Sequence, residues 1–153
     1  MKKVLLLLLV LMLVAPSCKK GDDGGSSFSC KIDGTSFEVE GLGAYATEFS
    51  SQFTIYGVSD INGNSSVNLM YMSLPLNSTP GTYKMDSSDR TGYYIDAAAG
   101  TYSTLWGQGT GTITIDEIDD THVKGSFEFT PYNSDDETKK KTITGGKFDV
   151  LFR

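Results

Sequence analysis

Apolar and polar residues alternate one by one along most of this chain, and this period of two constrains the fold more than any other feature. The clearest case is segment 123–130, in which Val123, Phe127 and Phe129 point one way while Lys124 and Glu128 point the other. Successive residues of a β-strand face opposite sides of the sheet, so one face of this segment is expected to meet a core and the other to meet water. No window of the sequence carries the spacing of a long amphipathic helix.

The same alternation recurs along the chain and predicts further strands. It is found at Phe28–Ile32, Phe37–Val39, Ile113–Ile115 and Phe148–Phe152. Segment 67–74 is apolar on both faces, which predicts a strand in the centre of a sheet. We count about nine or ten short strands, which predicts an antiparallel β-sandwich, or alternatively a closed or partly open β-barrel.

Turn residues separate these strands. Asp33-Gly34 lies between two short alternating runs, and Asn62-Gly63-Asn64 lies between two longer ones. Both sequences are typical of β-hairpins. Segment 131–138 has no alternation and contains several acidic residues, so it is predicted to be an acidic surface loop between the last two strands.

The first residues have a different character. An almost unbroken apolar run, Leu5–Val14, follows Lys2 and Lys3 and precedes Cys18 by four residues. The run is shorter than the ~20 apolar residues of a membrane-spanning helix, and this layout is typical of an export signal that is cleaved off. We therefore expect a signal peptide at 1–17, a flexible tether at 18–27 and a single all-β domain at 28–153.

The cleavage region, Ala15-Pro16-Ser17-Cys18, resembles a bacterial lipobox. It departs from the usual pattern at Ala15, where leucine is typical, and at Pro16. The resemblance implies that Cys18 is acylated and that membrane lipid is a partner of the chain, because several acyl chains hold a protein on a membrane almost permanently. The charged residues after Cys18 resemble the signal that sends lipoproteins of Bacteroidota to the outer face of the outer membrane. A generic solvated tether on the periplasmic face is the alternative.

Charge and cysteine content limit the partners and the redox chemistry. The formal charge is −6 at pH 7, and loss of Lys2 and Lys3 with the signal peptide would leave −8. An acidic chain repels phosphate backbones, so nucleic acid is not an expected partner. With Cys18 acylated, Cys30 would be the one remaining thiol, and its place in an alternating run predicts a small buried residue. A reactive or intermolecular thiol is the alternative.

Residues for catalysis or metal binding are sparse. His122 is the one histidine, and no serine stands in a Gly-x-Ser-x-Gly context. Segment 60–65 begins like a calcium loop but has serine at its sixth position, so it is interpreted as a hairpin turn. The acidic residues at 116–120 are interpreted as a solvated hairpin end, with a weak calcium site as the alternative. We expect no cofactor and no enzymatic activity.

Aromatic residues are the remaining candidates for a binding site. Tyr93, Tyr94, Tyr102 and Trp106 lie close together in the sequence, and exposed rings stack on sugars or peptides. The alternative is that Tyr93 and Tyr94, being adjacent in a strand, point to opposite faces and that one of them is a core residue.

Several strand-and-turn segments occur in an order that resembles a Bacteroidota lipoprotein family of unknown function. The segments are Ile32-Asp33-Gly34 with Phe37, Pro80-Gly81-Thr82-Tyr83, Gly111–Ile115, Gly125–Phe129 and Ile143–Phe148. The resemblance implies an outer-membrane location and an all-β fold, and it brings no catalytic residues.

Three functions are compatible with these observations. The first is a non-enzymatic lipoprotein with an interaction or envelope-structural role, which predicts a flat surface with the aromatic residues mostly buried; a protein or a glycan is a possible ligand. The second is a glycan-binding module of a polysaccharide-utilisation system, in which Trp106 and at least one of Tyr93, Tyr94 and Tyr102 would be exposed together in a groove. A hydrolase or inhibitor is the third.

Overall fold

The computed structural model describes residues 25–59 and 67–153. In this part of the chain it contains twelve strands and one short 3-10 turn, η1, at Gly41–Gly43. The strands are β1 (Ser27–Ile32), β2 (Thr35–Glu40), β3 (Ala44–Phe49), β4 (Gln52–Val58), β5 (Asn68–Pro75), β6 (Gly81–Lys84), β7 (Thr91–Asp96), β8 (Gly100–Ser103), β9 (Thr110–Ile118), β10 (His122–Thr130), β11 (Tyr132–Asn133) and β12 (Ile143–Leu151).

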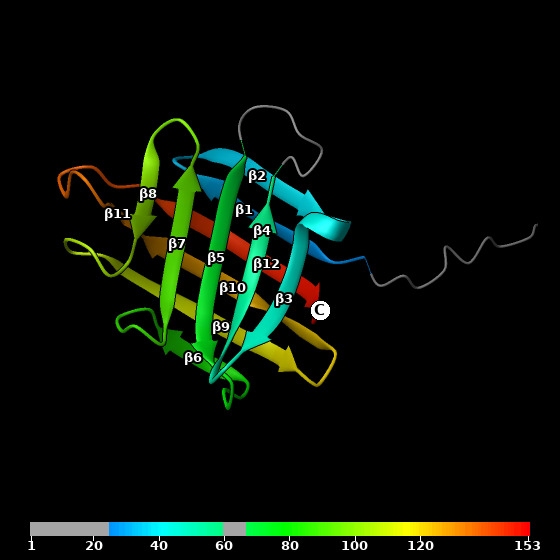
Figure 1. Ribbon diagram of the computed structural model, residues 1–153. Coiled ribbons are helices and arrows are strands. Elements are labelled where there is room, and N and C mark those ends of the chain that lie inside the picture. The colour runs from blue at the N-terminus through cyan, green and yellow to red at the C-terminus, as the bar shows by residue number, and fades with distance from the viewer. Residues whose placement is uncertain (1–24, 60–66) are drawn as a thin grey trace, which may run out of the picture.

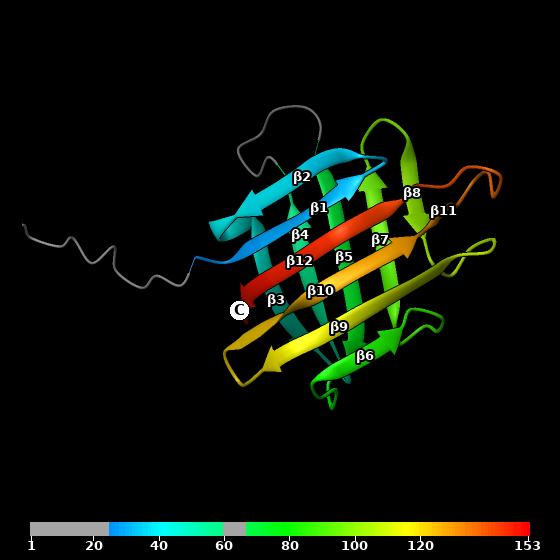
Figure 2. The same ribbon diagram turned by 180° about the vertical axis from the view of Figure 1, so that it is seen from behind.

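The strands form two six-stranded antiparallel sheets that pack face to face. Sheet A has the order β2-β1-β12-β10-β9-β6, and sheet B has the order β11-β8-β7-β5-β4-β3. Figure 1 shows sheet B in front with the strands of sheet A crossing behind it, and Figure 2 shows sheet A from the other side. The two sheets are not closed into one barrel, so the predicted β-sandwich is confirmed and the barrel alternative is wrong.

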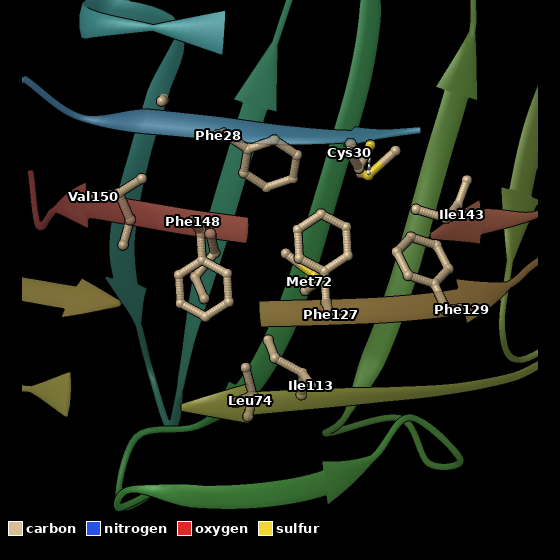
Figure 3. Packing of buried hydrophobic residues seen from close by; sticks show 14 of the residues in the cluster. Phe28, Cys30, Met72, Leu74, Ile113, Phe127, Phe129, Ile143, Phe148 and Val150 are labelled. Atoms are coloured by element: carbon tan, nitrogen blue, oxygen red, sulfur yellow. Dashed lines mark hydrogen bonds between the residues drawn. The ribbon is translucent and has the colours of Figure 1, made fainter. Parts of the chain in front are cut away.

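The core lies between the two sheets and is built from the apolar residues of the alternating segments. Val123, Phe127 and Phe129 of β10 are at most 4% exposed, as their spacing predicts, while Lys124 and Glu128 face solvent. Figure 3 shows Phe127 surrounded by aromatic and aliphatic side chains from both sheets. Strand β5, predicted to be central, lies between β7 and β4 inside sheet B.

The first hairpin has the predicted turn. Asp33 and Gly34 have φ values of 50° and 86°, both in the left-handed region that Asp-Gly turns adopt. The Asp33 carboxylate also accepts a hydrogen bond from the Thr142 N–H at 2.8 Å and lies 3.1 Å from Lys141 Nζ. The hairpin is thereby tied to the start of β12.

Cys30 is a buried core residue, as predicted. It is 5% exposed, and its thiol lies 3.8 Å from the sulfur of Met70 in the opposite sheet. Burial raises the pKa of the Cys30 thiol to about 12, so the thiol stays protonated and unreactive at physiological pH.

The structure differs from the prediction in three details. There are twelve strands in the described residues rather than nine or ten. Segment 131–138, predicted to be a loop throughout, contains the two-residue strand β11, and Asn133 in it is 4% exposed. The folded domain begins before Phe28, because Ser26 is 4% exposed and its hydroxyl accepts a hydrogen bond from the Leu151 N–H at 3.1 Å.

Other predictions concern residues that the structure does not describe. Cys18, the signal peptide, the turn at Asn62-Gly63-Asn64 and the segment 60–65 all lie outside the described residues. Strands β4 and β5 do pair antiparallel, as the hairpin prediction requires. No helix in the described ranges has the length and apolarity needed to cross a membrane.

Candidate ligand-binding surface

Five aromatic side chains form a continuous line across the outer face of sheet B, which we name the aromatic row. It consists of Tyr45, Tyr56, Tyr71, Tyr93 and Trp106. Consecutive ring centroids along it lie 4.9, 5.8, 4.6 and 5.9 Å apart. The four tyrosines and Trp106 are all half-buried. The row is therefore a contiguous aromatic surface that solvent reaches.

Strand register creates the row. Tyr45 lies directly opposite Tyr56, Tyr56 opposite Tyr71, and Tyr71 opposite Tyr93, in four neighbouring strands. Residues opposite each other in an antiparallel sheet share one face, and their Cβ atoms are about 4.5–5.5 Å apart. The neighbours in sequence of each tyrosine point inward, so a single outward ring from each strand joins the line.

Trp106 reaches the row from the loop that follows β8. The backbone N–H of Trp106 donates to the Ser103 carbonyl at 3.4 Å, and the backbone carbonyl of Trp106 accepts from the Gly109 N–H at 3.0 Å. Gly107 has a φ of 56°, and a Cβ there would lie 2.8 Å from the ring of Tyr132. Glycine therefore lets the loop fold back over the sheet, where Ser103, in line with Tyr93, becomes fully buried.

The orientation of the rings distinguishes Trp106 from the tyrosines. Tyr45 and Tyr56 are stacked with an interplanar angle of 18°, and Tyr71 and Tyr93 with an angle of 11°. Their ring faces are turned toward one another, so a ligand would meet ring edges and hydroxyl groups. Trp106 stands at 89° to Tyr93, at the end of the stack. In a perpendicular contact of this kind, Tyr93 covers at most one face of the indole ring.

Of the four residues proposed from the sequence, the structure brings Tyr93 and Trp106 together and separates Tyr94 and Tyr102 from them. Tyr94 and Tyr102 are each 4% exposed and pack against each other on the inner face, with centroids 6.1 Å apart. The Tyr94 hydroxyl donates to Asp96 at 3.4 Å. Burial, and then the charge of Asp96, raise the pKa of Tyr94 to about 12. The structure therefore has the alternative arrangement, in which Tyr94 is a core residue and its neighbour Tyr93 points outward.

A second line of side chains runs beside the aromatic row, which we name the hydroxyl row. It consists of Thr47, Thr54 and Ser73, which lie opposite one another in β3, β4 and β5. Thr54 Oγ1 and Ser73 Oγ are 3.0 Å apart and share a hydrogen bond. These hydroxyls add uncharged donors and acceptors to the face.

The two outer faces of the sandwich differ in charge. The outward strand positions of sheet B, in register with the aromatic and hydroxyl rows, carry no aspartate, glutamate, lysine or arginine in the described residues. Those of sheet A carry many: Lys31, Glu38, Glu40, Lys84, Lys124, Glu128, Lys147 and Asp149. In an acidic protein, the outer face of sheet B is thus an uncharged surface.

One cation borders this face. The Arg153 guanidinium lies 5.4 Å from the ring centroid of Tyr45, at the β3 end of the aromatic row. It donates to the carbonyls of Leu42 at 3.0 Å and Gly41 at 3.1 Å. Arg153 therefore holds Tyr45 and the η1 turn together through a cation–π contact and two hydrogen bonds.

The tyrosine hydroxyls of the row differ from that of Tyr83 in their hydrogen bonding within the described residues. Tyr83, elsewhere in the chain, donates its hydroxyl to the Thr79 carbonyl at 2.6 Å. Among the described residues, no such hydrogen bond engages the hydroxyls of Tyr45, Tyr56, Tyr71 and Tyr93. Each can donate one hydrogen bond and accept others.

Ionisation of Tyr71 gives a prediction at alkaline pH. Burial, and then the neighbouring Tyr93 and Tyr56, raise the pKa of Tyr71 from 10.0 to about 12. The unfolded chain ionises this residue from pH 10 while the folded chain keeps the proton until about pH 12, so the folded state loses stability as the pH rises through this window. We expect the urea midpoint of the wild type to fall in that range and that of Tyr71→Phe to fall less. An identical pH dependence of the two proteins would contradict this assignment.

The titratable groups outside the aromatic row make structural contacts. His122 Nε2 is hydrogen-bonded to Asp149 Oδ1 on the outer face of sheet A, and Lys124 Nζ lies 3.8 Å from the same carboxylate. Asp119, in the acidic segment 116–120, accepts hydrogen bonds from both the N–H and the hydroxyl of Thr121 at 2.8 Å, as a hairpin end requires. Within residues 25–59 and 67–153, no three histidine, cysteine or acidic side chains gather as a metal site would need.

Hollows in the described part of the chain lie outside the row. One of about 610 Å³ is lined by the ends of β6, β9, β10 and β12, including Lys84, Asp86 and Glu128. A second, of about 520 Å³, adjoins the Trp106 loop and is lined by Gly107, Gln108 and Tyr132 together with residues of the β11–β12 connection. A third, of about 490 Å³, lies beside the β3–β4 turn and the end of β5. Charges of both signs border the first hollow, so it does not favour one class of ligand.

Comparison with known families places the chain. A family model described as a domain of unknown function (DUF6252) matches residues 25–150, which is most of the sequence. The chain belongs to the DUF6252 family. This confirms the predicted membership of a family of unknown function. The aromatic row lies wholly within the DUF6252 domain, whereas Arg153 lies just beyond it. Searches of curated proteins and of solved structures gave no significant match.

Proposed function

We propose that this DUF6252 protein is a non-enzymatic, lipid-anchored binding protein that uses the outer face of sheet B to hold its partner. The observation that carries the proposal is the aromatic row on a face without charged strand residues. Tyrosine and tryptophan are enriched where proteins bind partners, because they supply large contact areas with few rotatable bonds, while charged residues are depleted at the centre of interfaces.

The proposed location rests on the sequence before the domain. The apolar run at 5–14 and the lipobox-like Ala15-Pro16-Ser17-Cys18 support export, cleavage and acylation of Cys18. We propose the cell-surface side of the outer membrane of a Bacteroidota cell as the site, with the periplasmic face as the alternative. Such a tether would leave the sandwich free to meet partners.

The non-enzymatic part of the proposal rests on what the titratable residues do. His122 is paired with Asp149, and Asp33 with Lys141 and the Thr142 N–H, in contacts that join strands. Acid–base catalysis would need such groups to be directed at a substrate. Here these titratable groups contact one another and stabilise the sandwich. The aromatic row contains side chains that can bind a partner.

The experiment compares four versions of the full-length protein in its native cells: wild type, Cys18→Ala, Tyr93→Ala/Trp106→Ala and the sheet A control Thr112→Ala/Ser126→Ala. Membrane fractionation and mass spectrometry are expected to find wild-type protein acylated at Cys18 and Cys18→Ala released from the membrane.

Purified domains are then tested against polysaccharides, envelope proteins and lipid vesicles. The Tyr93→Ala/Trp106→Ala protein is expected to lose the binding that the control keeps. An unmodified Cys18, or binding unaffected by the double change in sheet B, would contradict the proposal.

A further inference from the structure

We infer that the ligand of the aromatic row is a neutral glycan chain that lies across the strands of sheet B. This inference rests on the proposed function and adds the chemical class of the ligand. It is carried by three features of the face: the absence of charged residues at its outward strand positions, the indole face of Trp106 that Tyr93 does not cover, and the two parallel lines of hydroxyl groups.

Charge limits the class of ligand first. The chain has a formal charge of −6, so anionic polymers such as nucleic acids or sulfated glycans are repelled at long range. A cationic ligand would need carboxylates beside the row, and the outward strand positions of sheet B have none among the described residues. Arg153 at the row's end uses two of its five N–H donors in hydrogen bonds to the carbonyls of Gly41 and Leu42, which hold it beside Tyr45 at the edge of the face. A ligand without net charge would meet neither this repulsion nor the need for a paired charge on the face.

The geometry of Trp106 then supplies a stacking position. The indole plane stands at 89° to Tyr93, so this contact covers at most one of the two indole faces, and Trp106 is half-buried. Sugar rings present C–H groups on their flat sides, and these groups pack against the negative face of an aromatic ring. Trp106 is therefore the position in the row where a sugar ring can stack.

The tyrosines complete the site in a different way. Because they stack on one another, they present ring edges and hydroxyls to solvent. Thr47, Thr54 and Ser73 run alongside and present further hydroxyls. A sugar chain carries many hydroxyl groups that both donate and accept, and two parallel lines of uncharged donors and acceptors match this pattern.

The length of the row indicates a chain rather than a single sugar. It crosses β3, β4, β5 and β7 and ends at Trp106 beyond β7. With neighbouring strands about 4.8 Å apart, the tyrosines alone cover roughly 14 Å. An oligosaccharide or polysaccharide uses this length, whereas a monosaccharide would contact only one end.

The test uses a panel of neutral glucans, mannans, xylans and galactans together with uronic-acid-containing and sulfated glycans, applied to the folded domain. We expect at least one neutral glycan to bind, and the charged glycans to bind more weakly. Trp106→Ala is expected to weaken this binding at least ~10-fold, because it removes the aromatic ring on which a sugar ring would stack. Thr112→Ala on sheet A is the matched control and should bind as the wild type does. Trp106→Phe keeps a ring and should restore part of the affinity, which separates stacking from a folding defect.

Three outcomes would overturn the inference. One is that no neutral glycan binds, and the second is that binding is confined to charged glycans. The third is that Trp106→Ala binds as tightly as the wild type. Sedimentation of the same proteins separates this failure from that of the proposed function. If the domain self-associates or binds a protein through the row, and Trp106→Ala abolishes that contact, the proposed binding face is supported and the glycan inference is contradicted. If no partner of any class depends on Trp106, both fail.

Discussion

Replacing Phe127 with alanine is expected to destabilise the domain by about 3–5 kcal/mol, which approaches the whole stability of many domains of this size. Phe127 is 4% exposed, and its ring centroid lies 5.0 Å from that of Phe28, 6.0 Å from Phe129 and 6.3 Å from Phe148. Truncation removes apolar contacts and leaves a cavity lined by aromatic rings that cannot all move inward (Figure 3). Urea unfolding measures the effect.

Phe49→Ala provides the control for Phe127→Ala. It makes the same chemical change at the end of β3, where the ring is 84% exposed, and it should alter the free energy of unfolding by less than about 0.5 kcal/mol. A cost below about 1 kcal/mol for Phe127→Ala would mean that this ring is not the centre of the packing between the sheets.

Gly125→Ala is expected to have the second largest effect on stability, although it adds only one methyl group. A Cβ at this position would lie 2.0 Å from the backbone oxygen of Thr114 in β9 and 2.6 Å from the ring of Phe148. The backbone fixes the position of a Cβ, so no rotamer relieves the clash and the ladder between β9 and β10 must shift. We expect a loss at or above the upper end of the ~1–3 kcal/mol typical of overpacked sites.

The next residue along β10 is the control for Gly125→Ala. Ser126 lies on the outer face of sheet A, and Ser126→Ala should leave the unfolding midpoint nearly unchanged. If Gly125→Ala unfolded at the same urea concentration as Ser126→Ala, the close approach of β9 and β10 at this point would be wrong.

The fold class followed from the sequence because the physical rule behind it is local. Val123, Phe127 and Phe129 are buried since alternate residues of a strand share a face, and this needs no knowledge of the neighbouring strands. The Asp33-Gly34 turn was equally local, because its backbone angles suit these two residues. Strand β11 was missed because two residues are too short a run to show alternation.

The candidate binding surface could be predicted only in part, because it depends on pairing between distant segments. Tyr93 and Trp106 were found by their closeness in sequence, and Tyr94 and Tyr102 were grouped with them by the same criterion, although they point into the core. Tyr45, Tyr56 and Tyr71 were not identified. Alternation marks each of them as outward, but only the register of β3, β4, β5 and β7 aligns them, and register is set by the packing of the whole sheet.

The fluorescence of Trp106 tests most directly whether the aromatic row is the binding face, because the chain contains one tryptophan and its emission reports on this position alone. The measurement is a titration of the wild-type domain with the neutral glycan of the panel that binds most tightly, with emission and collisional quenching recorded together. Stacking of a sugar on the indole should shift the emission to shorter wavelength and reduce quenching, with the same saturation as the binding curve. Saturable binding that leaves both signals unchanged would place the ligand elsewhere and contradict the account.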